Sequence, residues 1–300
     1  MNINFEYYRI FYYVAKYNNF TKAAHALGNS QPNITRAMNC LENATQCTLF
    51  IRTNRGVRLT PEGERLYTKV AAAIALIQTA EDEMTERAGL EHGSITIGAS
   101  ETALSIYLLE KLRRFHMEYP GIRIKIYNHS TPQAIQSVKS GESDFAVVTS
   151  PVPATVKEPL KIIKLQSFQE ILTGGKTFAT LADRELELGE IRNYPFICLG
   201  KETMTYQFYN HLFLEHGLEI KPDTEVATTD QILPLVKCEL GLAFLPEPMA
   251  RQSIMQKEIV PIRLTEKIPK RHICMVYDLK RPMNTAAKQL KKILLEDISQ

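Results

Sequence analysis

The sequence has no hydrophobic run long enough to cross a membrane. Its longest apolar stretch covers residues 70–77, whereas a membrane-spanning helix needs about 20 apolar residues. Residues 1–20 are aromatic and polar, and they lack the basic start and apolar middle of a signal peptide. We therefore expect a cytoplasmic protein with no membrane partner.

Cysteine is scarce and poorly arranged for cross-linking or metal binding. The chain has five cysteines, an odd number, and no CxxC pair. Disulfide frameworks use even numbers of cysteines, and structural zinc sites use closely spaced cysteines or histidines. We therefore expect no disulfide framework and no metal site, and small buried thiols in a reducing compartment. The cysteines are Cys40, Cys47, Cys198, Cys238 and Cys274.

The common catalytic signatures are also missing. The sequence contains no GxGxxG, GxxxxGK(S/T), GxSxG or HExxH pattern, and its histidines are dispersed. Those patterns mark dinucleotide loops, phosphate loops, serine nucleophiles and zinc proteases. An enzyme is therefore not expected, and we predict neither catalytic residues nor a cofactor.

Length and charge indicate two domains with different partners. The chain has 300 residues, 44% hydrophobic and 23% charged, which is long enough for two domains of about 100–200 residues each. Residues 1–60 hold seven Lys/Arg and two Asp/Glu, a net charge of +5, so the remainder of a +3 chain carries −2. A basic end on a mildly acidic body favours a polyanion as the partner of that end alone.

Three helices are predicted in the basic end. Apolar residues recur every three and four positions over residues 5–17, the spacing of an amphipathic helix. Thr21 is the expected N-cap of a second helix, residues 22–27, which Gly28 can end. Ser30 is the expected N-cap of a third helix. The tight turn between the second and third helices is typical of a helix-turn-helix.

The third predicted helix has one packing face and one polar face. A rotation of 100° per residue places Ile34, Met38 and Leu41 together, with Arg36 and Asn39 opposite them. Gln, Arg and Asn near the start of such a helix can pair with base edges in the major groove of DNA. The alternative is an ordinary three-helix domain with a solvated polar face.

Residues 49–60 predict two short strands around a turn at residues 54–56, which is a wing. Arg52, Arg55 and Arg58 lie on or beside its tip. Basic arms of this kind commonly contact phosphates or enter the minor groove. The alternative for any one of these arginines is a side chain that is simply exposed to solvent on the turn.

Together these segments resemble the DNA-binding domain of LysR-type transcriptional regulators. The resemblance covers nearly all of residues 3–66, and it departs from the family pattern at Asn43 and residues 44–47, in the turn before the wing. The segments that carry it are FTKAAHAL at 20–27, SQP at 30–32, LE at 41–42, LF at 49–50, Arg52 and LTPEG at 59–63. The predicted DNA-binding residues are Thr21, Ser30, Gln31, Pro32, Asn33, Thr35, Arg36, Asn39, Arg52, Arg55 and Arg58.

A long linker helix is predicted next. Thr60 as N-cap and Pro61 in the first turn open a helix without a breaker before Gly89, about 42 Å long at 1.5 Å per residue. An apolar stripe along it predicts a dimer seam, and the resemblance implies a dimer whose recognition helices meet successive major grooves. The alternative is packing against its own C-terminal domain. The stripe is Leu66, Val70, Ala73, Ile74, Ile77, Ala80 and Met84.

From residue 93 onward, apolar strands alternate with helices. This order predicts parallel sheets with right-handed crossovers in two similar lobes. The last strand and helix are expected to return to the first lobe, so that two segments cross between the lobes as a hinge. The predicted strands are 95–98, 122–127, 145–148, 196–199, 224–226, 242–245 and 273–277. The predicted helices are about 103–118, after 131–132, 205–216, 230–239 and 284–297.

This order resembles the effector domain of the same family, which shares its architecture with periplasmic solute-binding proteins. The predicted fold class is α/β with an all-α-plus-wing N-terminal domain: a winged helix-turn-helix, a long linker helix and a two-lobed periplasmic-binding-protein-like α/β effector domain. Residues 1–60 are expected to bind DNA, 61–89 to link and dimerise, and 90–300 to bind effector. Lobe I is expected at about 90–163 and 268–300, and lobe II at about 164–267.

Serine and threonine cluster after the predicted strands. Ligands of open parallel sheets bind beyond the carboxyl ends of strands, near helix N-termini that favour anions. The resemblance implies that several hydroxyls face a cleft between the lobes, so we expect a small carboxylate or other oxyanion as effector. The alternative role is helix capping, and Glu101 would repel an anion if it pointed inward. The candidates are Ser100, Thr102, Ser130, Thr131, Thr149, Thr203, Thr205, Thr228 and Thr229.

The predicted function is a sequence-specific, DNA-binding transcription regulator controlled by a small-molecule effector. Effector binding is expected to change lobe closure, then subunit packing in a homodimer or homotetramer, and so the spacing of the recognition helices on double-stranded DNA. RNA polymerase is a further expected partner. Two alternatives stay open: a thiol-based redox sensor using Cys198, which has no second cysteine before Cys238, and a purely architectural DNA-binding protein.

Overall fold

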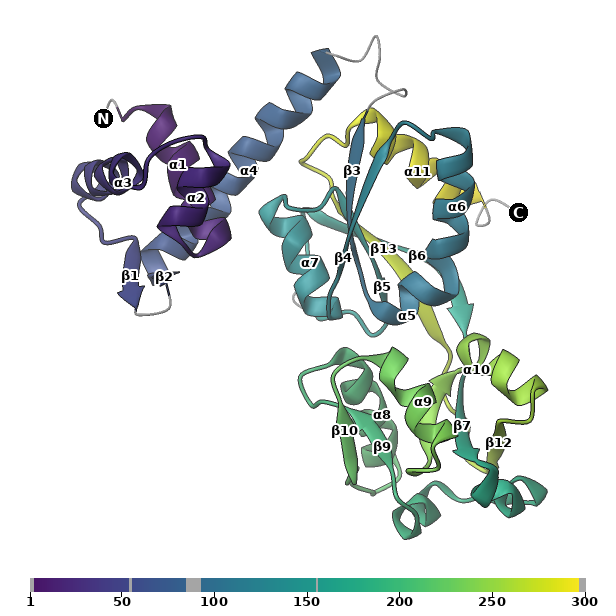
Figure 1. The fold of residues 1–300 in the computed structure, drawn as a ribbon. Helices are drawn as coiled ribbons and strands as arrows, with labels where there is room; N and C mark the ends of the chain where they lie inside the picture. Colours follow the sequence, from purple (N-terminus) through teal and green to yellow (C-terminus); the bar gives the residue numbers. More distant parts are fainter. Residues whose placement is uncertain (1–2, 54–55, 85–92, 155, 297–300) are drawn as a thin grey trace. The chain divides into compact units, whose positions relative to one another are not determined.

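A computed structural model describes residues 3–53, 56–84, 93–154 and 156–296 (Figure 1). The chain divides into an N-terminal unit, Met1–Met84, and a C-terminal unit that holds nearly all later residues. Each unit has its own hydrophobic core. None of the helices in the described ranges is long and apolar enough to span a membrane.

The N-terminal unit is a bundle of short helices. They are α1 (Phe5–Tyr17), α2 (Phe20–Ala26) and α3 (Gln31–Thr45). Phe11 and Val14 of α1 share a fully buried core with Ile34 and Leu41 of α3. The predicted apolar faces of the first and third helices are therefore the faces that pack, and the polar face of α3 is left outside.

Asn19, rather than Thr21, caps α2. The side-chain oxygen of Asn19 accepts a hydrogen bond from the backbone N–H of Lys22 at 3.0 Å. Asn18 ends α1 in the left-handed conformation, with φ 50°, so the chain turns into α2 earlier than expected. The predicted cap at Thr21 is wrong because an asparagine two residues earlier supplies the capping oxygen.

The predicted wing is present and is attached to the end of α1. Its strands β1 (Phe50–Thr53) and β2 (Gly56–Leu59) pair antiparallel. The backbone N–H of Val57 donates to the carbonyl oxygen of Asn18 at 3.0 Å. A Cβ at Gly56 would lie 2.5 Å from that oxygen, and the φ of Gly56 is +131°. Glycine is therefore needed there for both the backbone conformation and the close approach.

The linker helix α4 (Pro61–Met84) begins as predicted, because the hydroxyl of Thr60 accepts a hydrogen bond from a backbone N–H in its first turn at 3.0 Å. The first half of α4 packs within its own unit instead of forming a dimer seam. Val70 and Ile74, 7% and 8% exposed, belong to the core of the N-terminal unit, and Leu66 packs against that core.

The dimer-seam prediction is therefore wrong for the first half of the stripe. In this unit α4 is a further layer packed over the core that α1 and α3 form. Further along, Ala73 is exposed and Ile77 is 41% exposed. The side chains of Ala80 and Met84 lie outside the described part of the chain.

Lobe I of the C-terminal unit holds a five-stranded sheet in the order β4-β3-β5-β13-β6. Its strands are β3 (Ser94–Ala99), β4 (Arg123–Asn128), β5 (Phe145–Thr149), β6 (Leu160–Phe168) and β13 (Arg271–Asp278). Its helices are α5 (Glu101–Ala103), which continues through the π-helical turn η2 (Leu104–Leu108) into α6 (Leu109–Glu118), then α7 (Thr131–Ser140) and α11 (Thr285–Leu295). β3, β4 and β5 run parallel as predicted, whereas β13 runs antiparallel to both neighbours.

Lobe II has mixed rather than parallel sheets. Its strands are β7 (Glu170–Gly175), β8 (Glu185–Leu186), β9 (Ile197–Leu199), β10 (Thr224–Val226), β11 (Ala243–Pro246) and β12 (Ile259–Leu264). Its helices are η3 (Lys176–Asp183), η4 (Leu188–Asn193), α8 (Met204–Glu215), η5 (Thr229–Gln231), α9 (Ile232–Lys237) and α10 (Glu247–Met255). β9 and β10 are parallel, but β11 and β12 pair antiparallel with β7. The all-parallel prediction is wrong here because β7 arrives directly from lobe I without a crossover helix.

Two chain segments join the lobes, as Figure 1 shows. β6 leads into β7 through Gln169, and β12 leads into β13 through residues 265–270. Lobe II is thus one continuous stretch of chain. Lobe I is completed only when β13 inserts between β5 and β6.

Candidate functional site

The outer face of α3 presents the residues predicted to read DNA. Ser30 occupies the N-cap position, as expected, but its side chain makes no capping hydrogen bond. The side-chain amide of Gln31 donates to the hydroxyl of Thr35 at 3.2 Å, and Thr35 is half-buried. The exposed members of the predicted set are Thr21, Ser30, Gln31, Pro32, Asn33, Arg36, Asn39 and Arg58.

Glu42 links the candidate recognition helix to the wing. Its Oε1 accepts hydrogen bonds from the backbone N–H groups of Leu49 at 2.6 Å and Phe50 at 3.2 Å. α3 and the first wing strand are thereby held together. The side chain of Arg52 and the whole of Arg55 lie outside the described residues.

A cavity of about 340 Å³ opens between the two lobes of the C-terminal unit. Lobe I lines it with residues that follow β3, β4 and β5, and lobe II with residues that follow β9 and β10. Every hydroxyl residue of the predicted effector set lines this one cavity: Ser100, Thr102, Ser130, Thr131, Thr149, Thr203, Thr205, Thr228 and Thr229.

Several of these hydroxyls have structural partners. Thr203 caps α8, because its Oγ1 accepts from the N–H of Tyr206 at 3.1 Å. Thr228 forms a capping box at η5. The Ser130 hydroxyl donates to Oε1 of Gln133 at 2.9 Å. For Thr203 and Thr228 the capping alternative accounts for the side chain, whereas the Ser130 hydroxyl is engaged by the side chain of Gln133.

One hydrogen bond crosses the cavity from lobe to lobe. The hydroxyl of Thr102 in lobe I donates to Oγ1 of Thr229 in lobe II at 3.3 Å. Both residues are buried, 3% and 7% exposed. Opening the lobes would have to break this bond.

Arg271 lies beneath the cavity and contacts both lobes. Its side chain is 1% exposed. Nη2 donates to Oγ1 of Thr149 in lobe I and to Oγ1 of Thr205 in lobe II, at 3.0 Å each. Because a hydroxyl is both donor and acceptor, these two hydroxyls accept from Arg271 and keep their own protons for another acceptor.

The charge of Arg271 is compensated within the fold. Its Nη1 donates to Oε1 of Glu170 at 2.6 Å, and the Glu170 side chain is fully buried. Its guanidinium carbon lies 5.1 and 5.5 Å from the ring centroids of Phe208 and Phe168, within range of cation–π attraction. Burial and the nearby Glu170 carboxylate raise the pKa of Tyr209 well above its usual value.

Ser100 is a buried donor without a partner. Its Oγ is inaccessible and makes no hydrogen bond within the described part of the chain, although the residue lines the cavity. A buried polar group left unpaired costs about 1–3 kcal/mol. An acceptor atom on a ligand would recover that cost if the hydroxyl turned toward the cavity.

Two carboxylates line the cavity, and its described lining includes no lysine or arginine. Both oxygens of Glu101 are engaged: Oε1 accepts from the hydroxyl of Ser105 at 2.8 Å, and Oε2 accepts from the side-chain amide of Asn128. The carboxylate of Glu202 instead lies over Gly200, where a Cβ would meet its oxygens at 2.6 and 2.7 Å. Gly200 therefore leaves room for this carboxylate.

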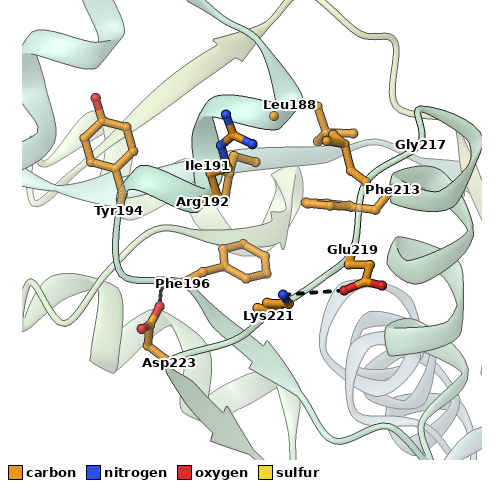
Figure 2. Close-up of a pocket in the computed structure, with 12 residues that line it drawn as sticks. Leu188, Ile191, Arg192, Tyr194, Phe196, Phe213, Gly217, Glu219, Lys221 and Asp223 are labelled. Atoms are coloured by element: carbon orange, nitrogen blue, oxygen red, sulfur yellow. Dashed lines mark hydrogen bonds and ion pairs between the residues drawn. The ribbon is translucent and has the colours of Figure 1, made fainter.

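A second cavity of about 410 Å³ lies within lobe II alone (Figure 2). Lys221 and Glu219 form an exposed ion pair at its rim, at 3.5 Å. Lobe I contributes no lining residue, and none of the predicted effector residues lines it. Movement between the lobes would not change this cavity, so it is not the candidate effector site. Its apolar lining is Leu188, Ile191, Phe196, Phe213 and Leu218.

Cys198 is buried in β9 at 2% exposure and does not line the cavity between the lobes. Burial raises the pKa of its thiol to about 12. The thiolate is the reactive form of cysteine, so this site suppresses its reactivity. All five cysteines are free thiols.

Sequence reasoning missed Arg271, Glu170, Glu42 and Glu202 as site residues. Glu42 belongs to the pattern that resembles the family, but nothing in that pattern indicates that its carboxylate accepts backbone hydrogen bonds from the wing. Glu170 is followed directly by Ile171 and Leu172, and Arg271 is separated by His272 from the apolar part of its strand. A charged residue at the start of such a strand is a weak signal of a buried pair.

Comparison with known proteins gives consistent matches over nearly the whole chain. Residues 88–299 match the model described as LysR substrate binding domain, and residues 5–64 match that of the bacterial regulatory helix-turn-helix protein, lysR family. The HTH-type transcriptional regulator YofA of Bacillus velezensis is 26% identical over 284 residues, covering 94% of each chain.

Two solved structures share the fold. Full-length CbnR in complex with its target DNA has a TM-score of 0.68 at 18% identity, covering 99% of each chain. The effector binding domain of QuiR in complex with shikimate has a TM-score of 0.59 at 17% identity, covering 68% of this chain and 96% of the QuiR chain. These matches confirm the predicted fold class of a winged helix-turn-helix followed by a two-lobed α/β domain.

Proposed function

Because the chain belongs to the LysR family of bacterial transcriptional regulators, we propose that it is controlled by a small carboxylate or other oxyanion bound in the cavity between its lobes. The supporting observation is the set of donors at that cavity. The hydroxyl of Ser100 is buried without a partner, and those of Thr149 and Thr205 accept from Arg271. An oxyanion is the ligand that pairs with such donors.

For DNA recognition, we propose that α3 enters the major groove and that the wing contacts the backbone. Gln31, Arg36 and Asn39 are exposed along α3 and have the chemistry to pair with base edges. Arg58, on the wing strand β2, is exposed and suits a phosphate contact. CbnR, which shares this fold, has been solved in complex with its target DNA, and this supports DNA as the partner of the N-terminal unit.

Control of DNA binding is proposed to pass through lobe closure in a dimer or tetramer. The Thr102–Thr229 hydrogen bond and Arg271 both connect the lobes around the cavity. An effector that contacts both lobes would shift the balance between open and closed forms by its differential affinity for them. The exposed part of the α4 stripe is the proposed contact between subunits.

Selection of bound DNA from genomic fragments by the purified full-length protein, followed by DNase protection with and without candidate carboxylates, tests this function. We expect an inverted repeat with half-sites about one helical turn apart, and a footprint that changes when a carboxylate binds. Unchanged protection with a carboxylate demonstrably bound would contradict the proposed control. Failure to select any DNA would contradict sequence-specific recognition.

A further inference from the structure

The cavity between the lobes combines two opposite kinds of ligand-binding group. On one side it offers hydroxyl donors at Ser100, Thr149 and Thr205, together with the N-termini of α7 and α8, where helix dipoles favour negative charge. It also holds the carboxylates of Glu101 and Glu202, and no lysine or arginine is among its described lining residues. A ligand of a single charge would satisfy only half of these groups.

Glu202 is the carboxylate available to a ligand. Glu101 already accepts hydrogen bonds from Ser105 and Asn128 on its own lobe. Glu202 is exposed at the cavity, and within the described residues no cation is paired with it. The absence of a side chain at Gly200 makes space for its carboxylate at the end of β9.

The buried cation beneath the cavity does not neutralise Glu202. Arg271 is paired with Glu170 at 2.6 Å, so the two charges form a compensated unit below the floor. What Arg271 provides to the cavity is the orientation of the Thr149 and Thr205 hydroxyls. A purely anionic effector would therefore meet these donors and also the unpaired negative charge of Glu202, which repels it.

We propose that the effector is a zwitterion of the amino-acid class, with a carboxylate and an ammonium group a few bonds apart. Resting on the proposed function, this assignment places the effector carboxylate at the Ser100, Thr149 and Thr205 hydroxyls and its ammonium group at Glu202. A simple carboxylate leaves Glu202 unpaired, and a simple amine leaves the three hydroxyl donors unpaired. Only a ligand with both charges satisfies both sides of the cavity.

The test uses the full-length protein and the standard L-amino acids, each compared with its deaminated carboxylic acid and its decarboxylated amine. Thermal shift identifies binders, and isothermal titration calorimetry measures their affinities. We expect at least one amino acid to bind about tenfold or more tightly than its acid or its amine. Glu202→Gln should weaken that amino acid about tenfold and leave its acid equal or tighter, as loss of a charge-assisted contact predicts.

Two further variants separate a local effect from a general one. Glu219→Gln removes an exposed carboxylate at the other cavity of lobe II and should leave the amino-acid affinity unchanged. Gly200→Ala keeps Glu202 but displaces its flexible carboxylate, so it should weaken the amino acid in the same direction as Glu202→Gln. Since Glu202 is exposed, its substitution should not prevent folding.

Acids that bind as tightly as their amino acids, with Glu202→Gln having no effect, would overturn the zwitterion and leave the carboxylate effector standing. Binding of the amines without binding of the acids or the amino acids would overturn both the zwitterion and the carboxylate effector. Absence of binding by every amino acid tested would also overturn the zwitterion. In that case the acids, measured in their own right, decide whether the carboxylate effector survives.

Discussion

Arg271 and Glu170 form an ion pair at 2.6 Å with side chains 1% and 0% exposed. Glu170 begins β7 and Arg271 begins β13, so the pair joins the two segments that cross between the lobes. The same arginine donates to Thr149 and Thr205 beneath the cavity. One side chain thus connects the hinge to the candidate effector site, and its loss should affect both stability and ligand binding.

Arg271→Met should lower the free energy of unfolding by about 3–5 kcal/mol, because it leaves Glu170 as an uncompensated buried charge. The double variant with Glu170→Met should recover much of that loss. Urea unfolding of the full-length protein followed by far-UV circular dichroism measures both effects. Arg251→Ala is the control, since its pair with Glu247 is exposed and its loss should leave the free energy of unfolding nearly unchanged. A double variant as unstable as the single one would contradict this account.

Ser100→Ala should leave stability unchanged or slightly higher, because it removes a buried hydroxyl that has no partner. The same change should weaken binding of the effector. Ser137→Ala is the matched control: that residue is also buried, but its hydroxyl donates to the carbonyl of Ala134 at 2.8 Å, so its loss should cost about 1 kcal/mol. Equal losses in thermal unfolding for the two variants would show that Ser100 has a structural role instead.

Gln31→Ala and Arg58→Ala should weaken DNA binding in different ways. The first should cost about 1–3 kcal/mol on the selected site and relax base preference, because Gln31 is proposed to contact a base edge. The second should weaken all sequences alike and reduce the slope of log K against log salt by about 1. Fluorescence anisotropy at several salt concentrations, on selected and random duplexes, distinguishes them. Identical behaviour of the two variants would rule out the assigned division of roles.

Iodoacetamide should label Cys47 and Cys238, which are exposed, and spare Cys198 and Cys274, which are buried. Labelling should be followed between about pH 7 and about pH 9. Cys198 should stay unreactive over that range, because burial raises its pKa to about 12. Peptide mass spectrometry of the native protein gives each rate. Modification of Cys198 as fast as Cys47 would revive the redox-sensor alternative.

Ile77→Glu should shift the protein toward monomer if the exposed half of the α4 stripe joins two copies. Ile77 is 41% exposed and lies beyond the part of α4 that is buried in its own unit. Met255→Glu, at a side chain 72% exposed in lobe II, is the control and should leave the mass unchanged. Sedimentation equilibrium measures both. A dimer of unchanged affinity in the Ile77 variant would place the subunit interface elsewhere.

Local signals predicted the helical parts of the fold well. The bounds of α1 follow from apolar spacing alone, and Thr60 caps α4 as its sequence context indicates. Helix ends that depend on a choice between two capping side chains were less predictable. Asn19 and Thr21 are both good caps, and the left-handed conformation of Asn18 decides between them.

The strands that join the lobes could not be predicted in the same way. β6 mixes apolar residues with Lys161, Lys164 and Gln166, so it has no clean alternation of apolar and polar positions. Its partner β13 lies about 100 residues later in the chain. The pairing depends on contacts distant in sequence, which short-range patterns do not contain.

The effector candidates were found because hydroxyl residues follow strands, and topology then brings those strand ends together. What the sequence could not separate was capping from free hydroxyls. Thr203 and Ser100 both precede a helix, yet one caps it and the other is buried without a partner. That difference depends on side-chain direction within the folded lobes.

The order of chain segments has a consequence for synthesis. Lobe II is one uninterrupted stretch, whereas the sheet of lobe I lacks its strand between β5 and β6 until β13 has been made. During synthesis the N-terminal unit and lobe II leave the ribosome with all their strands and helices, whereas the sheet of lobe I still lacks β13. Arg271 stands on that last strand, so the candidate effector site is completed last. A chain that stops before it would carry a complete helix-turn-helix and an incomplete C-terminal unit.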